Sequence, residues 1–84
     1  MTTYNGYESY DHWNTALWLN NDESFYNIML NETEQAVYMK QSIADAVGNI
    51  IRQLPEQTPD GATWQGDTIV ELFLENYNEM LQYS

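Results

Sequence analysis

Few side chains in this 84-residue sequence have the chemistry for catalysis or metal binding. His12 is the only histidine, and its acidic neighbours along the chain are Glu8 and Asp11. One imidazole with two carboxylates near a chain terminus is a weak metal-binding pattern, so we expect a surface histidine, no metal and no other cofactor. Lys40 is one of only two basic residues, and no catalytic partner accompanies it in a recognisable pattern.

The sequence lacks the patterns typical of common enzyme classes. It contains no recognisable Ser-His-Asp motif and no glycine-rich phosphate loop. The oxygen-rich segment 20–23 does not fit a calcium loop, because no central glycine follows and no acid stands at the twelfth loop position. With thirteen acids in the chain, close carboxylate pairs are expected by chance. We therefore predict that the protein is not an enzyme.

The charge of the chain is strongly unbalanced. Thirteen acids and two bases give a formal net charge of −11. This charge argues against binding to nucleic acid or anionic membranes, which normally requires a Lys/Arg surface. It favours attraction to basic surfaces, such as those of proteins that handle nucleic acid. Solubility alone is the alternative explanation. A disordered chain is excluded, because 43% hydrophobic and 14% aromatic residues are enough to form a core.

Length and composition predict one domain over residues 1–84. The chain has no cysteine, which is compatible with a reducing cytoplasm. No apolar run approaches the ~20 residues that span a membrane, and the N-terminus has no basic region followed by a hydrophobic one. We expect a protein without membrane contact in the cytoplasm of a host cell.

Hydrophobic periodicity predicts an all-α fold, a small bundle of about four helices. After an irregular segment 1–8, two short helices are expected at 9–20 and 21–30, with Ser9 and either Asn21 or Asp22 as N-caps. The longest helix is expected over residues 31–54, with a capping box from Asn31 and Glu34. Its broad apolar face suits the central member of the bundle.

The rest of the pattern predicts how this helix ends and the last one begins. Pro55 should end the central helix, and a loop should occupy residues 55–67. Lys40 falls on the apolar face of the central helix, where we expect it to extend its stem to solvent or to pair with a carboxylate. Thr68 and Glu71 form a second capping box, which predicts the start of the last helix.

The last helix carries acids at a spacing of four residues: Asp67, Glu71, Glu75 and Glu79. Like charges at this spacing destabilise a helix by roughly 0.2–0.5 kcal/mol per pair. The row is either a negative surface for a basic partner or an ordinary solvated face. Along a helix such acids recur every ~6 Å, whereas phosphates on one DNA strand advance ~3.4 Å. A mimic of nucleic acid would therefore need further acids beside the row, and the candidates are Asp22, Glu23 and Asp45.

Two tryptophans offer a different kind of contact. Trp18 lies on a helix that is apolar nearly all round, so it is either buried between helices or exposed as a binding residue. Trp64 lies in the predicted loop, where we expect it to fold back over the core; exposure at a binding site is the alternative.

Two segments resemble a family of small proteins of bacteriophages and other mobile elements. The family pattern is Tyr-x-Thr-Trp-x-x-Ala-Leu-Trp-x-x-Asn-Asp-Glu-x-x-Tyr, and the chain departs from it at His12, where the family has Thr. The matching positions are Tyr10, Trp13, Ala16, Leu17, Trp18, Asn21, Asp22, Glu23 and Tyr26. A later Thr-Pro-Asp-Gly-x-x-Trp segment matches Thr58, Pro59, Asp60, Gly61 and Trp64. The family has no assigned biochemistry, so the resemblance implies a biological setting only.

Setting and charge together predict an inhibitor of host defence. Small acidic proteins of mobile elements often resemble anti-restriction and anti-CRISPR proteins. We expect this protein to bind a basic groove on a host CRISPR effector or nuclease and to block access by nucleic acid. The acids of the last helix, together with Asp22, Glu23 and Asp45, would stand in for phosphates. The alternative is a small interaction or regulatory module that associates through exposed aromatics such as Trp18, with itself as a homodimer or with a partner helix.

Overall fold

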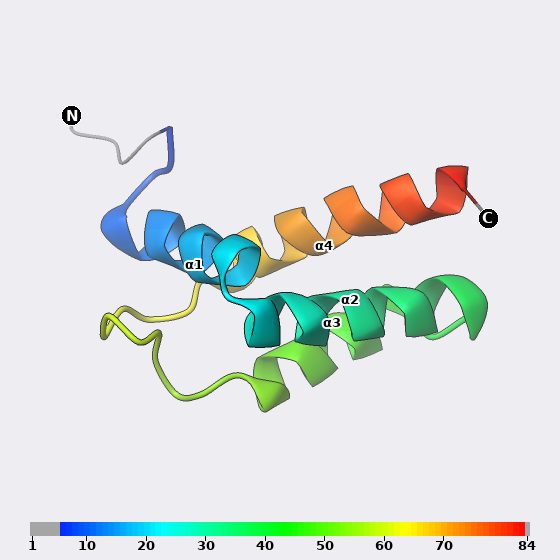
Figure 1. The fold of residues 1–84 in the computed structure, drawn as a ribbon, viewed down its shortest axis with the longest axis horizontal. Helices are drawn as coiled ribbons and strands as arrows, with labels where there is room; N and C mark the ends of the chain where they lie inside the picture. The colour runs from blue at the N-terminus through cyan, green and yellow to red at the C-terminus, as the bar shows by residue number, and fades with distance from the viewer. Residues whose placement is uncertain (1–5, 84) are drawn as a thin grey trace.

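The computed structural model describes residues 6–83, which form four α-helices and no β-strand. The helices are α1 (Tyr10–Asn21), α2 (Glu23–Tyr38), α3 (Ile43–Gln53) and α4 (Gly66–Gln82). Helices α2 and α4 each contact the other three helices, whereas α1 and α3 do not contact each other (Figure 1). The predicted all-α fold of four helices is therefore confirmed. Of the expected irregular segment 1–8, only residues 6–8 are described; they precede α1 and are not helical.

The first two helices begin at the predicted caps. Ser9 Oγ accepts a hydrogen bond from the backbone N–H of His12 at 3.2 Å. Asp22 Oδ1 accepts one from the N–H of Phe25 at 3.1 Å. Each bond satisfies an N–H group that has no partner within the first helical turn. Asp22 is the only residue between α1 and α2, so the two helices meet at a tight corner.

The predicted helix over residues 31–54 is wrong. The chain continues α2 from Glu23 through Tyr38 and breaks at residues 39–42, before α3 starts at Ile43. Lys40 in this turn has a φ of 58°, which is left-handed backbone that a helix does not contain. Ser42 Oγ accepts from the N–H of Asp45 at 3.1 Å and so caps α3. The helical period continues across the turn, and this continuity concealed it from sequence reasoning.

The break has a clear packing reason. It lets α3 fold back against α2, so that both helices bury a face on the same core. Ala36 of α2 and Ala46, Val47 and Ile50 of α3 are all buried there. A single straight helix would carry these residues away from each other at 1.5 Å per residue.

Two further expectations fail for the same reason. Asn31 and Glu34 form no capping box, because both lie inside α2. Lys40 does not lie on an apolar helix face; it is exposed in the turn, and no carboxylate of residues 6–83 forms an ion pair with it.

The core lies between the four helices. Its largest fully buried apolar side chains are Leu19 from α1, Met29 from α2, Ile50 from α3, and Ile69 and Phe73 from α4. Burying a side chain of this size stabilises the fold by about 1.5–3 kcal/mol relative to leaving it in water. All four helices thus contribute to one core.

The last helix starts two residues before the predicted capping residue. Gly66 begins α4, and Gln65 is its N-cap without a side-chain cap bond. The Gln65 N–H instead donates to Thr15 Oγ1 of α1 at 3.0 Å. Thr68 is buried in the first turn, so the capping box expected from Thr68 and Glu71 is wrong.

Within residues 6–83, no helix has the combined length and hydrophobicity that crossing a membrane requires.

Candidate functional site

A partly buried polar cluster joins α1 to the loop between α3 and α4. Asn14 of α1 donates through Nδ2 to Asp60 Oδ2 at 2.9 Å and accepts through Oδ1 from Thr58 Oγ1 at 2.6 Å. Trp18 Nε1 donates to the same Asp60 oxygen at 2.9 Å. We call Asn14, Trp18, Thr58 and Asp60 the α1–loop clamp. Because Asn14 and Thr58 are buried, their hydrogen bonds replace those lost to water.

The loop is shaped to present these groups. Thr58 exchanges backbone hydrogen bonds with the turn that follows: its N–H donates to Ala62 O, and its carbonyl accepts from Gly61 N–H. Thr58 Oγ1 also accepts from the Ala62 N–H at 3.0 Å. Gly61 has a φ of +86°, a conformation that favours glycine. The Pro-Asp-Gly segment, residues 59–61, therefore has a direct structural role.

The clamp lowers the pKa of Asp60 below its ordinary value of 3.8. The main cause is the hydrogen bond from Asn14, followed by the one from Trp18, because both donors stabilise the ionised carboxylate. Burial acts in the opposite direction. Asp60 was not among the predicted interaction residues, although it stands in one of the two family segments.

Trp18 and Trp64 both have partners inside the protein. Trp64 is half-buried, donates through Nε1 to the Pro55 carbonyl at 2.8 Å and packs edge-on against Phe25 at 5.3 Å between ring centroids. This confirms the expected packing of Trp64 over the core. Trp18 also packs edge-on against Phe25, with 6.4 Å between the ring centroids. A partner role for Trp18 stays a prediction, and its indole N–H is already used in the clamp.

The predicted acids of α4 are all exposed, but they do not form a straight row. Each step of four residues rotates by about 40° around the helix, so the set Asp67, Glu71, Glu75 and Glu79 spans about 120°. At one end, Asp67 and Glu71 line a hollow together with His12. At the other end, Glu79 lines a pocket between α2 and α4.

The other predicted acids lie in the first turns of different helices. Asp22 caps α2, Glu23 follows it, and Asp45 is in the first turn of α3. Acids are favourable at helix N-termini because of the helix dipole, so each has a structural reason for its position.

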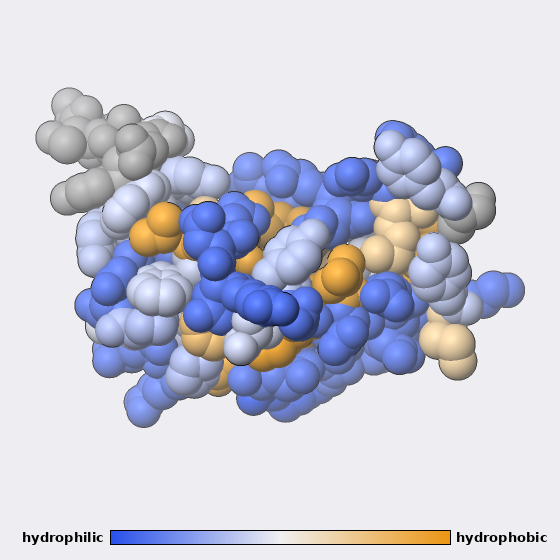
Figure 2. All heavy atoms as spheres, in the orientation of Figure 1, coloured by the Kyte–Doolittle hydropathy of each residue, from blue (hydrophilic) through white to orange (hydrophobic). Residues whose placement is uncertain are grey.

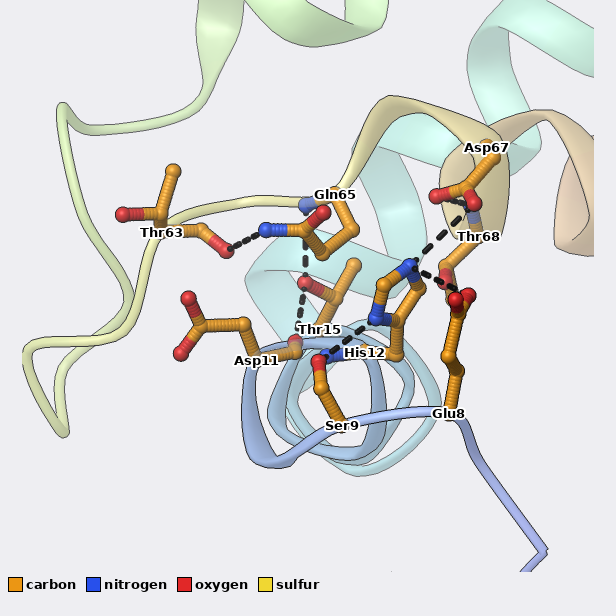
Figure 3. A network of polar contacts seen from close by, with 9 residues as sticks. All are labelled: Glu8, Ser9, Asp11, His12, Thr15, Thr63, Gln65, Asp67 and Thr68. Carbon is orange, nitrogen blue, oxygen red and sulfur yellow. Dashed lines mark hydrogen bonds and ion pairs between the residues drawn. The ribbon is translucent and has the colours of Figure 1, made fainter. Parts of the chain in front are cut away.

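His12 lies in the hollow at the start of α4 (Figure 3). Its Nε2 is 3.2 Å from Asp67 Oδ2 and 3.6 Å from Glu8 Oε2. Its Nδ1 is 2.6 Å from Ser9 Oγ. Asp11, the expected neighbour, points its carboxylate away from the ring (Figure 3). The acid that reaches His12 from across the fold is Asp67, 55 positions further along the chain.

The pocket between α2 and α4 has a mixed lining: Tyr26, Leu30, Asn76, Glu79, Met80 and Tyr83. Tyr83 beside it is 82% exposed. Met39 in the α2–α3 turn is 70% exposed. Hydrophilic residues cover most of the face in Figure 2, and hydrophobic residues show there as small separate groups.

The chain belongs to the family of unknown function DUF7249, whose model matches residues 1–83. No curated protein and no solved structure shows significant similarity to the chain. The family match covers nearly the whole chain, far more than the two segments that carried the resemblance.

Proposed function

We propose that this protein inhibits host defence for a phage or mobile element by binding a basic nucleic-acid-binding surface and occluding it. The observation that carries the proposal is that its carboxylates are not buried and that few of them form ion pairs. All thirteen lie within residues 6–83, and none is buried. The only ion pairs recorded in that part of the chain are those of His12 with Glu8 and Asp67.

The two basic side chains do not neutralise the α4 acids. Lys40 lies in the α2–α3 turn, and Arg52 of α3 donates to Asn49. Glu71, Glu75 and Glu79 therefore have no basic partner within residues 6–83. A partner with a basic groove would be attracted over a distance of about 10 Å at moderate salt, and binding would weaken as salt increases.

A two-stage experiment tests the proposal. Immobilised wild-type protein is incubated with host lysate at low salt and at about 0.5 M salt, and the captured complex is identified. The purified complex is then assayed for binding to its own DNA or RNA with increasing amounts of this protein. We expect capture at low salt only, and competition between this protein and the nucleic acid for the same site.

A pair of variants isolates the α4 acids from net charge. Glu71/Glu75→Gln and Glu34/Glu56→Gln each remove two exposed carboxylates from a chain of charge −11. Only the first should weaken competition markedly. Equal weakening by both would mean that net charge matters rather than the α4 face, and simultaneous binding of protein and nucleic acid would refute occlusion.

The second candidate is a module that associates through apolar contacts. It is favoured by the α2–α4 pocket with its exposed rim residue Tyr83. Association of this kind should tolerate high salt and should be lost in Tyr26→Ser or Tyr83→Ser, while the α4 acid variants leave it unchanged. Sedimentation at low and high salt separates a homodimer from a heterologous complex.

A further inference from the structure

We propose that Glu8, His12 and Asp67 bind one divalent transition-metal ion of the Zn²⁺ type. Their ligand atoms all lie within 4.8 Å of one another. Glu8 precedes α1, His12 is in α1, and Asp67 is in the first turn of α4, so the set depends on the tertiary fold. The inference is independent of the proposed inhibitor function.

The separations fit a metal centre. Zn²⁺ takes nitrogen and carboxylate oxygen ligands at about 2.0–2.2 Å in tetrahedral geometry, which places neighbouring ligand atoms about 3.3–3.6 Å apart. His12 Nε2 lies 3.2 Å from Asp67 Oδ2 and 3.6 Å from Glu8 Oε2. An ion between the three atoms would therefore need only small side-chain adjustments.

In two of the three side chains, the atom that would not bind the metal already has a hydrogen-bond partner. His12 Nδ1 shares a hydrogen bond with Ser9 Oγ, and Nε2 is the ring nitrogen that faces both carboxylates (Figure 3). A proton on Nδ1, donated to Ser9, leaves the Nε2 lone pair for the metal, as is usual for histidine ligands. Asp67 Oδ1 accepts from the Thr68 N–H at 2.9 Å, which leaves Oδ2 for the ion.

The site is open for entry and for a fourth ligand. The side chains of Glu8 and Asp67 are 81% and 69% exposed, whereas that of His12 is only 17% exposed. Glu71 lines the same hollow and can supply another oxygen, directly or through water. Nitrogen-containing sites of this kind select Zn²⁺ or its neighbours over Mg²⁺ and Ca²⁺, which prefer all-oxygen ligand sets.

The single histidine makes the test unambiguous. With no cysteine in the chain, a nitrogen-ligated metal must use His12, whose ring signals are unique in a proton–carbon NMR spectrum of untagged protein. We expect ZnCl₂ to shift these signals until one equivalent is bound, while MgCl₂ at equal concentration does not. Calorimetry on the same samples gives the affinity and stoichiometry.

Variants separate a site from diffuse attraction to an acidic surface. His12→Gln should abolish the saturable binding, and Glu8→Gln should weaken it severalfold without affecting the helices. Glu56→Gln changes the charge equally but lies in the distant loop, so it should bind as wild type. The absence of saturable Zn²⁺ binding, or equal binding by Glu8→Gln and Glu56→Gln, would overturn the proposal and leave His12 as a hydrogen-bonded link between α1 and α4.

Discussion

The α1–loop clamp and the outer face of α4 use polar residues in opposite ways. In the clamp, Asn14 binds both Thr58 and Asp60, and both polar atoms of its side-chain amide have partners inside the protein. On the outer face of α4, carboxylates such as Glu75 stand in solvent without a recorded cation partner within residues 6–83. The first arrangement stabilises this fold, whereas the second leaves charge available for another molecule.

The comparison also explains the two segments of the family pattern. Trp18 from the first segment contacts Asp60 from the second, and Phe25 packs against Trp64. The segments are thus the two sides of one internal contact. These contacts give both segments a role in the fold.

The largest effect is expected from breaking the clamp at its centre. Asn14→Ala removes the partner of buried Thr58 and one donor to Asp60, and it should lower the free energy of unfolding by about 1–3 kcal/mol. Urea denaturation followed by circular dichroism measures this. A loss no larger than that of an exposed control, Asn27→Ala, would show that the clamp contributes little.

A glycine pair tests whether the clamp loop depends on its backbone. Gly61→Ala forces alanine into left-handed backbone and should cost about 1–2 kcal/mol. Gly66→Ala at the start of α4 meets no atom within 4 Å and has no positive φ. It should stabilise by about 0.4–1 kcal/mol through the unfolded chain. The two changes should therefore shift the urea midpoint in opposite directions. Equal shifts would show that the turn does not depend on the left-handed backbone of Gly61.

Acid should weaken the clamp through Asp60. Its pKa is lowered in the fold, chiefly by Asn14, so the ionised carboxylate stabilises the protein above the unfolded pKa and this contribution is lost as pH falls through the folded one. The stability difference between wild type and Asp60→Asn should therefore shrink as pH falls below 3.8. Urea titrations at about pH 6 and about pH 3 measure it. A difference independent of pH would exclude Asp60 as the titrating group.

The smallest effect is expected on α4, and its sign is opposite. Glu75→Gln removes the like-charge contacts with Glu71 and Glu79, so it should stabilise the helix by about 0.2–0.5 kcal/mol for each pair. The gain should disappear at about 1 M salt because the charges are screened. Thermal unfolding at two salt concentrations measures this, with Glu56→Gln as the control. Destabilisation would show that these acids contribute to the fold.

Several elements of the fold could be predicted because their signals are local. Ser9 and Asp22 cap the helices that follow them, since a cap depends on residues within one turn. The Pro-Asp-Gly turn was recognisable because glycine at Gly61 permits positive φ. The α2–α3 turn was not, because Lys40 carries no turn signal and the apolar period runs through it.

The candidate site shows the same division. Exposure of Glu71, Glu75 and Glu79 followed from their position opposite the apolar face of α4. The separation of Glu79 from Asp67 around the helix could also be calculated from its pitch. The partner of His12 could not, because the nearest acids along the chain gave no indication of Asp67.

The amino-acid sequence by itself determined an acidic all-α protein with four helices, since composition and hydrophobic period are properties of the chain alone. Only the tertiary structure decided where the central helix breaks, which carboxylate Asn14 and Trp18 bind, and which acids meet His12. These outcomes depend on contacts between residues more than 40 positions apart or on the packing of α3 against α2. Local preference does not encode such contacts; the shared core of the four helices brings them together.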